Sequence, residues 1–109
     1  MLKNIALNYF KTFSNKDIVN LKTFFSEDIE LRDWEIKVKG LSNVVKANKK
    51  IFDSVESIKI EPINLYEFKA TLIAEIEIQI NNKEIILVTD IIEFNSVHKI
   101  KALRAYKGN

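Results

Sequence analysis

The chain has 109 residues, 47% of them hydrophobic and 29% charged, and its 17 basic and 15 acidic residues give a formal net charge of +2. This length and composition predict one globular domain over residues 1–109. With no cysteine, one histidine and two isolated glycines, the sequence excludes a disulfide framework, a zinc–thiolate site, a multi-histidine metal site and a glycine-rich phosphate loop. Any chemistry must therefore use carboxyl, tyrosine, lysine or hydroxyl groups.

The basic residues do not form a coherent patch. The tightest cluster, Lys46, Lys49 and Lys50, contains no aromatic residue and is typical of a solvated helix face, so we expect no nucleic-acid partner. Apolar runs are far shorter than the roughly 18 residues that span a bilayer, and the N-terminus lacks the pattern of a signal peptide. We expect a soluble cytoplasmic protein with no membrane contact, no metal and no cofactor.

The N-terminal segment has the periodicity of helices. Apolar residues recur at helical spacing over residues 2–13, which predicts an amphipathic helix with Tyr9 on its buried side. A second helix is expected to begin at Asp17 and to carry Phe24 and Phe25 on its buried side.

The period then changes to that of strands and back again. Apolar and charged residues alternate over residues 29–38, which predicts two short strands joined near residues 33–35. Ser42 is the expected N-cap of a third helix, whose apolar side includes Val44 and Phe52.

The remaining chain reads as strands. Alternation predicts strands over residues 58–62, 74–80, 84–94 and about 99–106, with Asn81–Asn82 as a two-residue hairpin turn because asparagine tolerates positive φ. Three helices followed by a four-strand meander predict an α+β domain, in which the helices pack on one face of a strongly curved antiparallel sheet. Such a layout can enclose a cavity between the two layers.

Asp90 interrupts the most apolar strand. By alternation it lies on the face that also carries Val88 and Ile92. A carboxylate there costs several kcal/mol unless it is paired or protonated, and a protonated carboxyl is a hydrogen-bond donor. The alternative interpretation is a local shift of the pleat, with Asp90 at the surface and paired with a lysine.

Two further residues have a structural and a functional interpretation. Tyr9 can be a core aromatic residue whose hydroxyl group is satisfied. Asp33, which precedes Trp34 at the end of a strand, can be a turn-forming aspartate.

Taken together, these residues resemble a known superfamily. The segments NYFKTFSNKDIVNLKTFFSEDIELRDW, KGLSNVVKANKKIF and VTDIIEFNSVHKIKALRAY resemble the SnoaL-like branch of the nuclear transport factor 2-like (NTF2-like) superfamily. The resemblance covers essentially the whole chain. It implies a cone of curved sheet wrapped around three N-terminal helices, with an internal pocket and, in many members, a homodimer.

Within this superfamily, the closest functional parallel is ketosteroid isomerase. The resemblance implies that Asp33 is a general base, and that Tyr9 and a protonated Asp90 donate hydrogen bonds to the oxygen of an enolate. The implied reaction is a cofactor-independent proton transfer on a small apolar carbonyl compound. Where the isomerase has supporting tyrosines, this chain has Phe25 and Asn48. The residues expected to line the pocket are Phe25, Trp34, Val88, Ile92 and Leu103.

Other functions remain open at this stage. The missing tyrosines also suit a non-catalytic protein that binds an apolar ligand, or a dimerisation module. Epoxide hydrolysis in this fold uses an arginine between two aspartates, a spacing that neither Arg32 nor Arg104 offers, so this chemistry and polyketide cyclisation rank lowest. A homodimer is expected through the sheet, with apolar surface supplied by alternate residues of the strand at 72–80.

Overall fold

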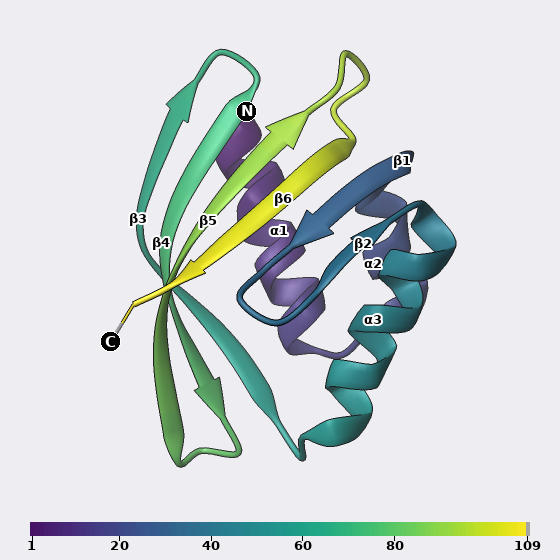
Figure 1. Cartoon of the computed structure of the whole chain (residues 1–109). Coiled ribbons are helices and arrows are strands. Elements are labelled where there is room, and N and C mark those ends of the chain that lie inside the picture. The colour runs from purple at the N-terminus through teal and green to yellow at the C-terminus, as the bar shows by residue number, and fades with distance from the viewer. Residues whose placement is uncertain (109) are drawn as a thin grey trace.

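The structure is a computed structural model that describes residues 1–108. Helices and strands follow one another in two blocks (Figure 1). The elements are α1 (Leu2–Ser14), α2 (Ile18–Leu21), a 3₁₀ turn (Lys22–Phe24), β1 (Phe25–Arg32), β2 (Lys37–Lys39), α3 (Leu41–Ser54), β3 (Ile58–Phe68), β4 (Thr71–Ile80), β5 (Glu84–Phe94) and β6 (Ile100–Lys107). The predicted α+β class is confirmed.

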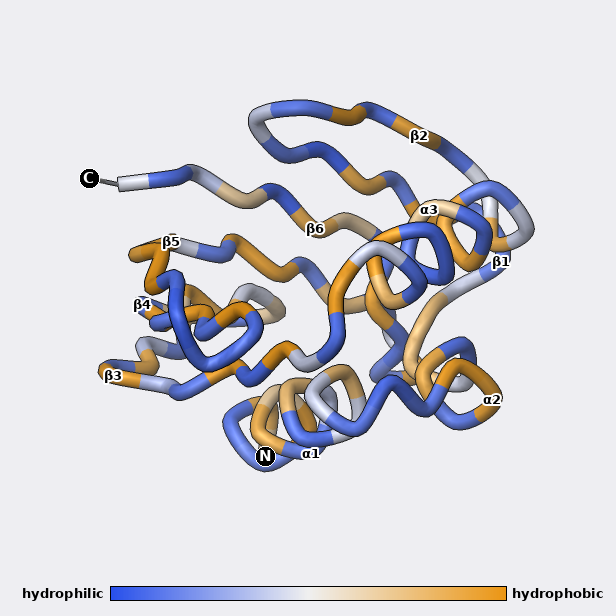
Figure 2. Tube along the Cα trace, turned by 90° about the horizontal axis from the view of Figure 1, so that it is seen from below, coloured by the Kyte–Doolittle hydropathy of each residue, from blue (hydrophilic) through white to orange (hydrophobic). Residues whose placement is uncertain are grey.

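The six strands form one sheet in the order β2-β1-β6-β5-β4-β3. The meander β3–β6 is antiparallel throughout, as predicted, and so is the β1–β2 pair. Only β1 and β6 run parallel, because the chain crosses from one side of the sheet to the other between them. The sheet is therefore mostly, not wholly, antiparallel. Figure 2 shows it curving around the helices, with α1 and α3 on the concave side.

The predicted hairpin turn is confirmed. Asn81 and Asn82 both have positive φ, at 54° and 57°, between β4 and β5. The side chain of Asn81 also accepts hydrogen bonds from the backbone N–H groups of Glu56 and Ser57, at 2.7 and 3.1 Å. The turn thus fastens the hairpin to the start of β3.

Two helix boundaries differ from the prediction. The second helix ends at Leu21, and Phe25 begins β1, where it pairs with Ile100 of β6. Helix α3 begins after Gly40, not at Ser42. Gly40 adopts φ 91° and its N–H group donates to the carbonyl oxygen of Ile29, at 2.8 Å. A left-handed turn that only glycine adopts without strain therefore sets the start of the helix.

The third difference lies in β3, which continues through Pro62 to Phe68. The register of its pairing with β4 shifts between Pro62 and Asn64. Proline lacks the N–H group of a regular ladder, and a bulge on an edge strand tolerates this loss. The strand therefore continues beyond Pro62, where the sequence predicted that it would end.

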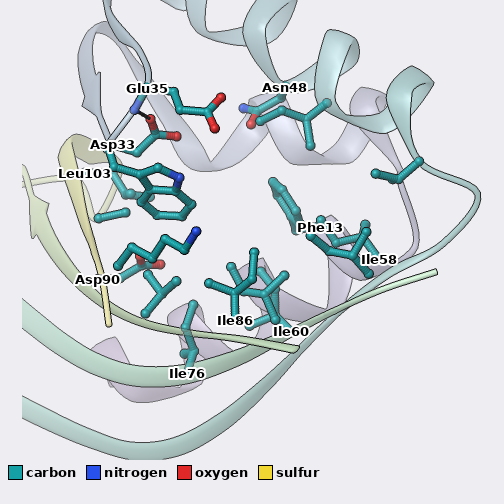
Figure 3. A pocket seen from close by; sticks show the side chains of 18 of the residues that line it. Phe13, Asp33, Glu35, Asn48, Ile58, Ile60, Ile76, Ile86, Asp90 and Leu103 are labelled. Atoms are coloured by element: carbon teal, nitrogen blue, oxygen red, sulfur yellow. Dashed lines mark hydrogen bonds between the residues drawn. The ribbon is translucent and has the colours of Figure 1, made fainter. Parts of the chain in front are cut away.

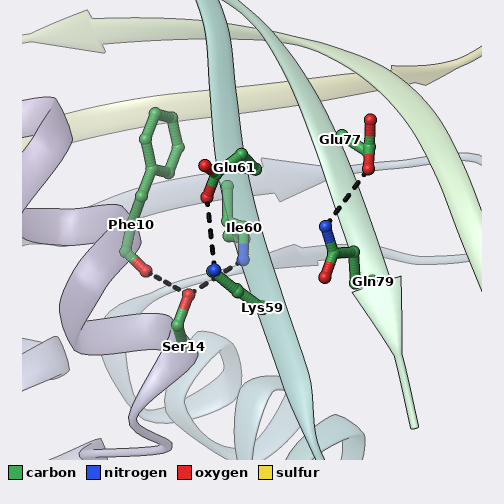
Figure 4. A network of polar contacts seen from close by, with 7 residues as sticks. All are labelled: Phe10, Ser14, Lys59, Ile60, Glu61, Glu77 and Gln79. Carbon is green, nitrogen blue, oxygen red and sulfur yellow. Dashed lines mark hydrogen bonds and ion pairs between the residues drawn. The ribbon is translucent and has the colours of Figure 1, made fainter. Parts of the chain in front are cut away.

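One half-buried hydroxyl group, that of Ser14, joins α1 to the sheet. Ser14 donates to the carbonyl oxygen of Phe10 at 2.8 Å and accepts from the N–H group of Ile60 at 2.9 Å (Figure 4). The other contacts in that view, between Lys59 and Glu61 and between Gln79 and Glu77, each join residues of one strand. Ser14 therefore gives an edge-strand N–H group a partner on the helix.

The core lies between the helices and the concave face of the sheet. On β4 this face carries Leu72, Ala74 and Ile76, all essentially inaccessible to solvent, followed by Ile78 and Ile80. The expectation that this row supplies surface for dimerisation is therefore wrong, because it packs inward. None of the helices in residues 1–108 is long and apolar enough to cross a membrane.

Candidate functional site

A cavity of about 380 Å³ lies between the sheet and the helices. Its floor is a run of isoleucines from β3, β4 and β5, and Phe13 and Ile51 close it from α1 and α3 (Figure 3). Tyr9, Asp33 and Asp90 all line it. Residues from three distant parts of the sequence are thus brought to one mainly apolar cavity.

Asp90 lies on the inner face of the sheet. Its side chain is 6% exposed, and Val88, Ile92 and Phe94 on the same face are also buried. It forms no ion pair within residues 1–108. The interpretation that places Asp90 at the surface beside a lysine is therefore wrong.

Burial determines the protonation of this carboxyl. Loss of solvent, and secondly the charge of Asp33, raise the pKa of Asp90 from 3.8 to about 7. Below neutral pH the group is protonated and can donate a hydrogen bond to a ligand in the cavity. The same desolvation, together with the charge of Asp90, raises the pKa of Tyr9, so its hydroxyl group keeps its proton and is also a donor.

The ring of Tyr9 is held by aromatic neighbours. It contacts Phe10, Phe13, Phe24 and Phe25 with ring centroids 5.6–6.3 Å apart. These contacts fix the direction of the side chain from α1. No hydrogen bond of its hydroxyl group to residues 1–108 is observed, and the hydroxyl group can therefore bind a ligand.

Asp33 sits in the turn that follows β1. Its Oδ1 accepts hydrogen bonds from the backbone N–H groups of Glu35 and Ile36, at 2.7 and 2.8 Å. The turn-forming interpretation is therefore correct, and the same bonds orient the carboxylate. Oδ2 has no partner within residues 1–108. Because Asp33 also lines the cavity, Oδ2 is available to accept a proton.

The open side of the cavity is charged. Trp34, which is partly exposed, lines it beside Lys107, whose Nζ lies 5.9 Å from the centre of the indole ring. Glu35 and Glu84 line it as well. An apolar ligand would therefore pass polar side chains before it reached the isoleucines.

Of the five residues expected to line the pocket, three line the cavity and two do not. Trp34, Val88 and Leu103 line the cavity. Phe25 and Ile92 do not, and here the expectation has to be corrected. Phe25 packs with its edge against the ring of Tyr9, and Ile92 is inaccessible in the core beneath the helices. Both belong to the packed core that surrounds the cavity.

Sequence reasoning did not assign Asn48, Glu35 or Lys107 to the cavity wall. Asn48 lies on the buried stripe of α3, four residues after Val44 and before Phe52, and this spacing could have placed it there. Lys107 continues the inward alternation of Leu103 and Ala105. Within residues 1–108, no three acidic or histidine side chains gather as metal ligands.

No family model and no curated protein matches the chain in sequence. Solved structures do match in shape. An NTF2-like protein of unknown function from Cytophaga hutchinsonii has a TM-score of 0.84 at 12% identity, covering 99% of this chain and 90% of that one. A SnoaL-like protein of unknown function from Burkholderia thailandensis has a TM-score of 0.85 at 9% identity, covering 99% and 94%.

A candidate ketosteroid isomerase from Kribbella flavida matches equally well. Its TM-score is 0.83 at 11% identity, over 99% of this chain and 78% of that one. The chain therefore has the NTF2-like, SnoaL-like fold, as the resemblance implied. Identities this low establish the fold and leave the activity to be argued from the site.

Proposed function

We propose that the protein is a cofactor-independent isomerase that enolises a small apolar carbonyl compound. The observation that carries the proposal is that Tyr9, Asp33 and Asp90 line one cavity. The ionised Asp33 takes a proton from the carbon next to the carbonyl group. Tyr9 and protonated Asp90 donate hydrogen bonds to the oxygen that becomes negative, and Asp33 returns the proton to another carbon.

The charges of the site suit this sequence of steps. Burial keeps Tyr9 neutral and keeps Asp90 neutral below about pH 7, whereas Asp33 has backbone N–H donors that accommodate its charge. The isoleucine floor excludes water from the enolate, which strengthens both hydrogen bonds. The fold likeness to a candidate ketosteroid isomerase supports the same reaction class.

The test is the conversion of 3-cyclohexen-1-one to its conjugated isomer, followed by ultraviolet absorbance. Asp33→Asn removes the base and should lower turnover by about 10²–10⁴-fold, with an unchanged circular dichroism spectrum. Asp53→Asn, an exposed aspartate of α3 outside the cavity, is the matched control and should retain full turnover. Equal turnover in Asp33→Asn and the wild type would contradict the proposal.

A second candidate is a non-catalytic protein that binds an apolar ligand in the same cavity. It is favoured by Tyr9, whose ring packs against aromatic side chains and whose hydroxyl group has no supporting hydrogen bond within residues 1–108. In this case Asp33→Asn would leave the affinity for a phenol unchanged, and no carbonyl compound would exchange its protons in the presence of the wild type.

We also propose a homodimer, formed through the outer face of the sheet. This face exposes Tyr66, Phe68, Ile85, Leu87 and Tyr106. Its charge is uneven, since Glu75 and Glu77 lie on β4 and Arg32 on β1, whereas Arg104 of β6 is paired with Glu93. A two-fold axis can set acidic strands against basic ones. Light scattering at micromolar concentration should give twice the monomer mass; the mass of one chain would contradict the proposal.

A further inference from the structure

One polar group in the cavity has no role in the proton transfer. Asn48 is 3% exposed, lies on α3 and lines the cavity, and its Nδ2 has no hydrogen-bond partner in residues 1–108. A buried amide without a partner costs free energy, so natural cores rarely retain one. A ligand that accepts a hydrogen bond at this point would remove the cost.

The position of Asn48 separates it from Asp90, one of the two oxygen-binding residues. Figure 3 shows Asn48 on the helix side of the cavity, beside Glu35, and Asp90 on the sheet side, near the isoleucines. Apart from the charged residues at the open side, the lining between these two points is mainly apolar. A bound molecule that satisfies both has one oxygen at each end of a hydrocarbon body.

We propose that Asn48 is a specificity-determining residue, and that the ligand is an apolar carbonyl compound with a second oxygen that accepts a hydrogen bond from Asn48 Nδ2. The inference rests on the proposed function, because that function places the carbonyl oxygen at Tyr9 and Asp90. Glu35, drawn on the same side of the cavity as Asn48, can accept a hydrogen bond if the second oxygen belongs to a hydroxyl group.

The test uses phenols, whose hydroxyl group mimics the enol, in pairs that differ by one group at the far end. The pairs are 2,6-dihydroxynaphthalene with 6-methyl-2-naphthol, and hydroquinone with 4-methylphenol. Dissociation constants are measured by fluorescence titration at pH 6, where Asp90 holds its proton. In the wild type, at least one diol should bind roughly 3- to 10-fold more tightly than its methyl partner, beyond the twofold statistical advantage of a symmetric molecule.

Two variants make the result specific. Asn48→Leu keeps the approximate shape of the side chain and should abolish the preference while leaving the affinity for the methyl compounds unchanged. Asn48→Ala serves the same purpose if the leucine side chain fills the cavity. Asn43→Leu, on the exposed side of the same helix, should keep the preference.

The outcomes separate this inference from the proposed function. Equal binding of both members of each pair, or a preference that survives in both Asn48 variants, would overturn the role of Asn48. Tyr9→Phe tests the other end of the ligand. It should weaken the binding of 4-methylphenol whether or not Asn48 has the proposed role. If it does not, the oxygen-binding pair itself is wrong and both proposals fail.

Discussion

Two carboxyl groups on β5, Asp90 and Glu93, lie three residues apart and face opposite sides of the sheet. Glu93 lies on the outer face and is ion-paired with Arg104 across the ladder. That contact also raises the pKa of Arg104. Asp90 lies on the inner face, is buried, and has no ion-pair partner within residues 1–108.

The comparison distinguishes polar groups that stabilise the fold through a partner from buried polar groups that have no partner and lower its stability. Ser14 belongs with Glu93, because both have partners. Asn48 belongs with Asp90: within residues 1–108, Asn48 Nδ2 has no hydrogen-bond partner and Asp90 has no ion-pair partner. Removing a partnered group should lower stability, and removing an unpartnered one should raise it. Ligand-binding sites often retain groups that lower the stability of the fold.

The largest expected effect is the dependence of stability on pH. Because the pKa of Asp90 is about 7 in the folded protein and 3.8 in the reference state, the folded protein holds a proton that the unfolded chain has released between these values. Stability should therefore fall as pH rises from 4 to 8, on the order of 4 kcal/mol. Urea unfolding at both pH values measures this fall.

Asp90→Asn should remove this fall and should be more stable than the wild type at pH 8. Glu93→Gln, the comparison on the outer face, should keep it. A wild-type protein that is equally stable at pH 4 and pH 8 would show that Asp90 stays ionised in the fold.

The next effect concerns Asn48. Asn48→Leu removes a buried amide that lacks a partner and adds apolar contacts, so the free energy of unfolding should rise by about 1–3 kcal/mol. The midpoint of thermal unfolding measures the change. Asn43→Leu, which is exposed, should change stability little; a destabilised Asn48→Leu would show that the amide is satisfied.

Ser14→Ala should act in the opposite direction. It leaves the N–H group of Ile60 without its partner, and stability should fall by about 1 kcal/mol in urea unfolding. The control is Thr12, two residues earlier in α1, whose hydroxyl group donates to the carbonyl oxygen of Asn8 in the same helix. Equal effects of Thr12→Ala and Ser14→Ala would contradict a role of Ser14 in joining helix and sheet.

The smallest effect is expected at the paired carboxyl. Glu93 and Arg104 are each about one-third exposed, so solvent screens their attraction. Glu93→Gln should lower stability by about 0.5 kcal/mol, and less in high salt. A loss of several kcal/mol would mean that the outer face is covered, as in the proposed homodimer.

Most of the architecture follows from local pattern. The period of 3.6 residues over α1, the alternation on β4 and β5, and the two asparagines of the hairpin turn each specify their element without distant contacts. Boundaries were less predictable. The start of α3 depends on the φ of Gly40 and its bond to Ile29, and the length of β3 depends on pairing with β4.

The sequence by itself placed Asp90 on the more apolar face of its strand, because side chains alternate along a strand, and the burial of Asp90 in the structure excluded a shifted pleat. The sequence also restricted the chemistry to carboxyl, tyrosine, lysine or hydroxyl groups through the absence of cysteine and the single histidine. Only the tertiary structure decided which of these groups share a cavity. Tyr9, Asp33, Asn48 and Asp90 come from two helices, a turn and a strand, and the curvature of the sheet brings them together. Only the structure shows that Asn48 Nδ2 has no hydrogen-bond partner within residues 1–108, because this depends on all the residues that pack around it.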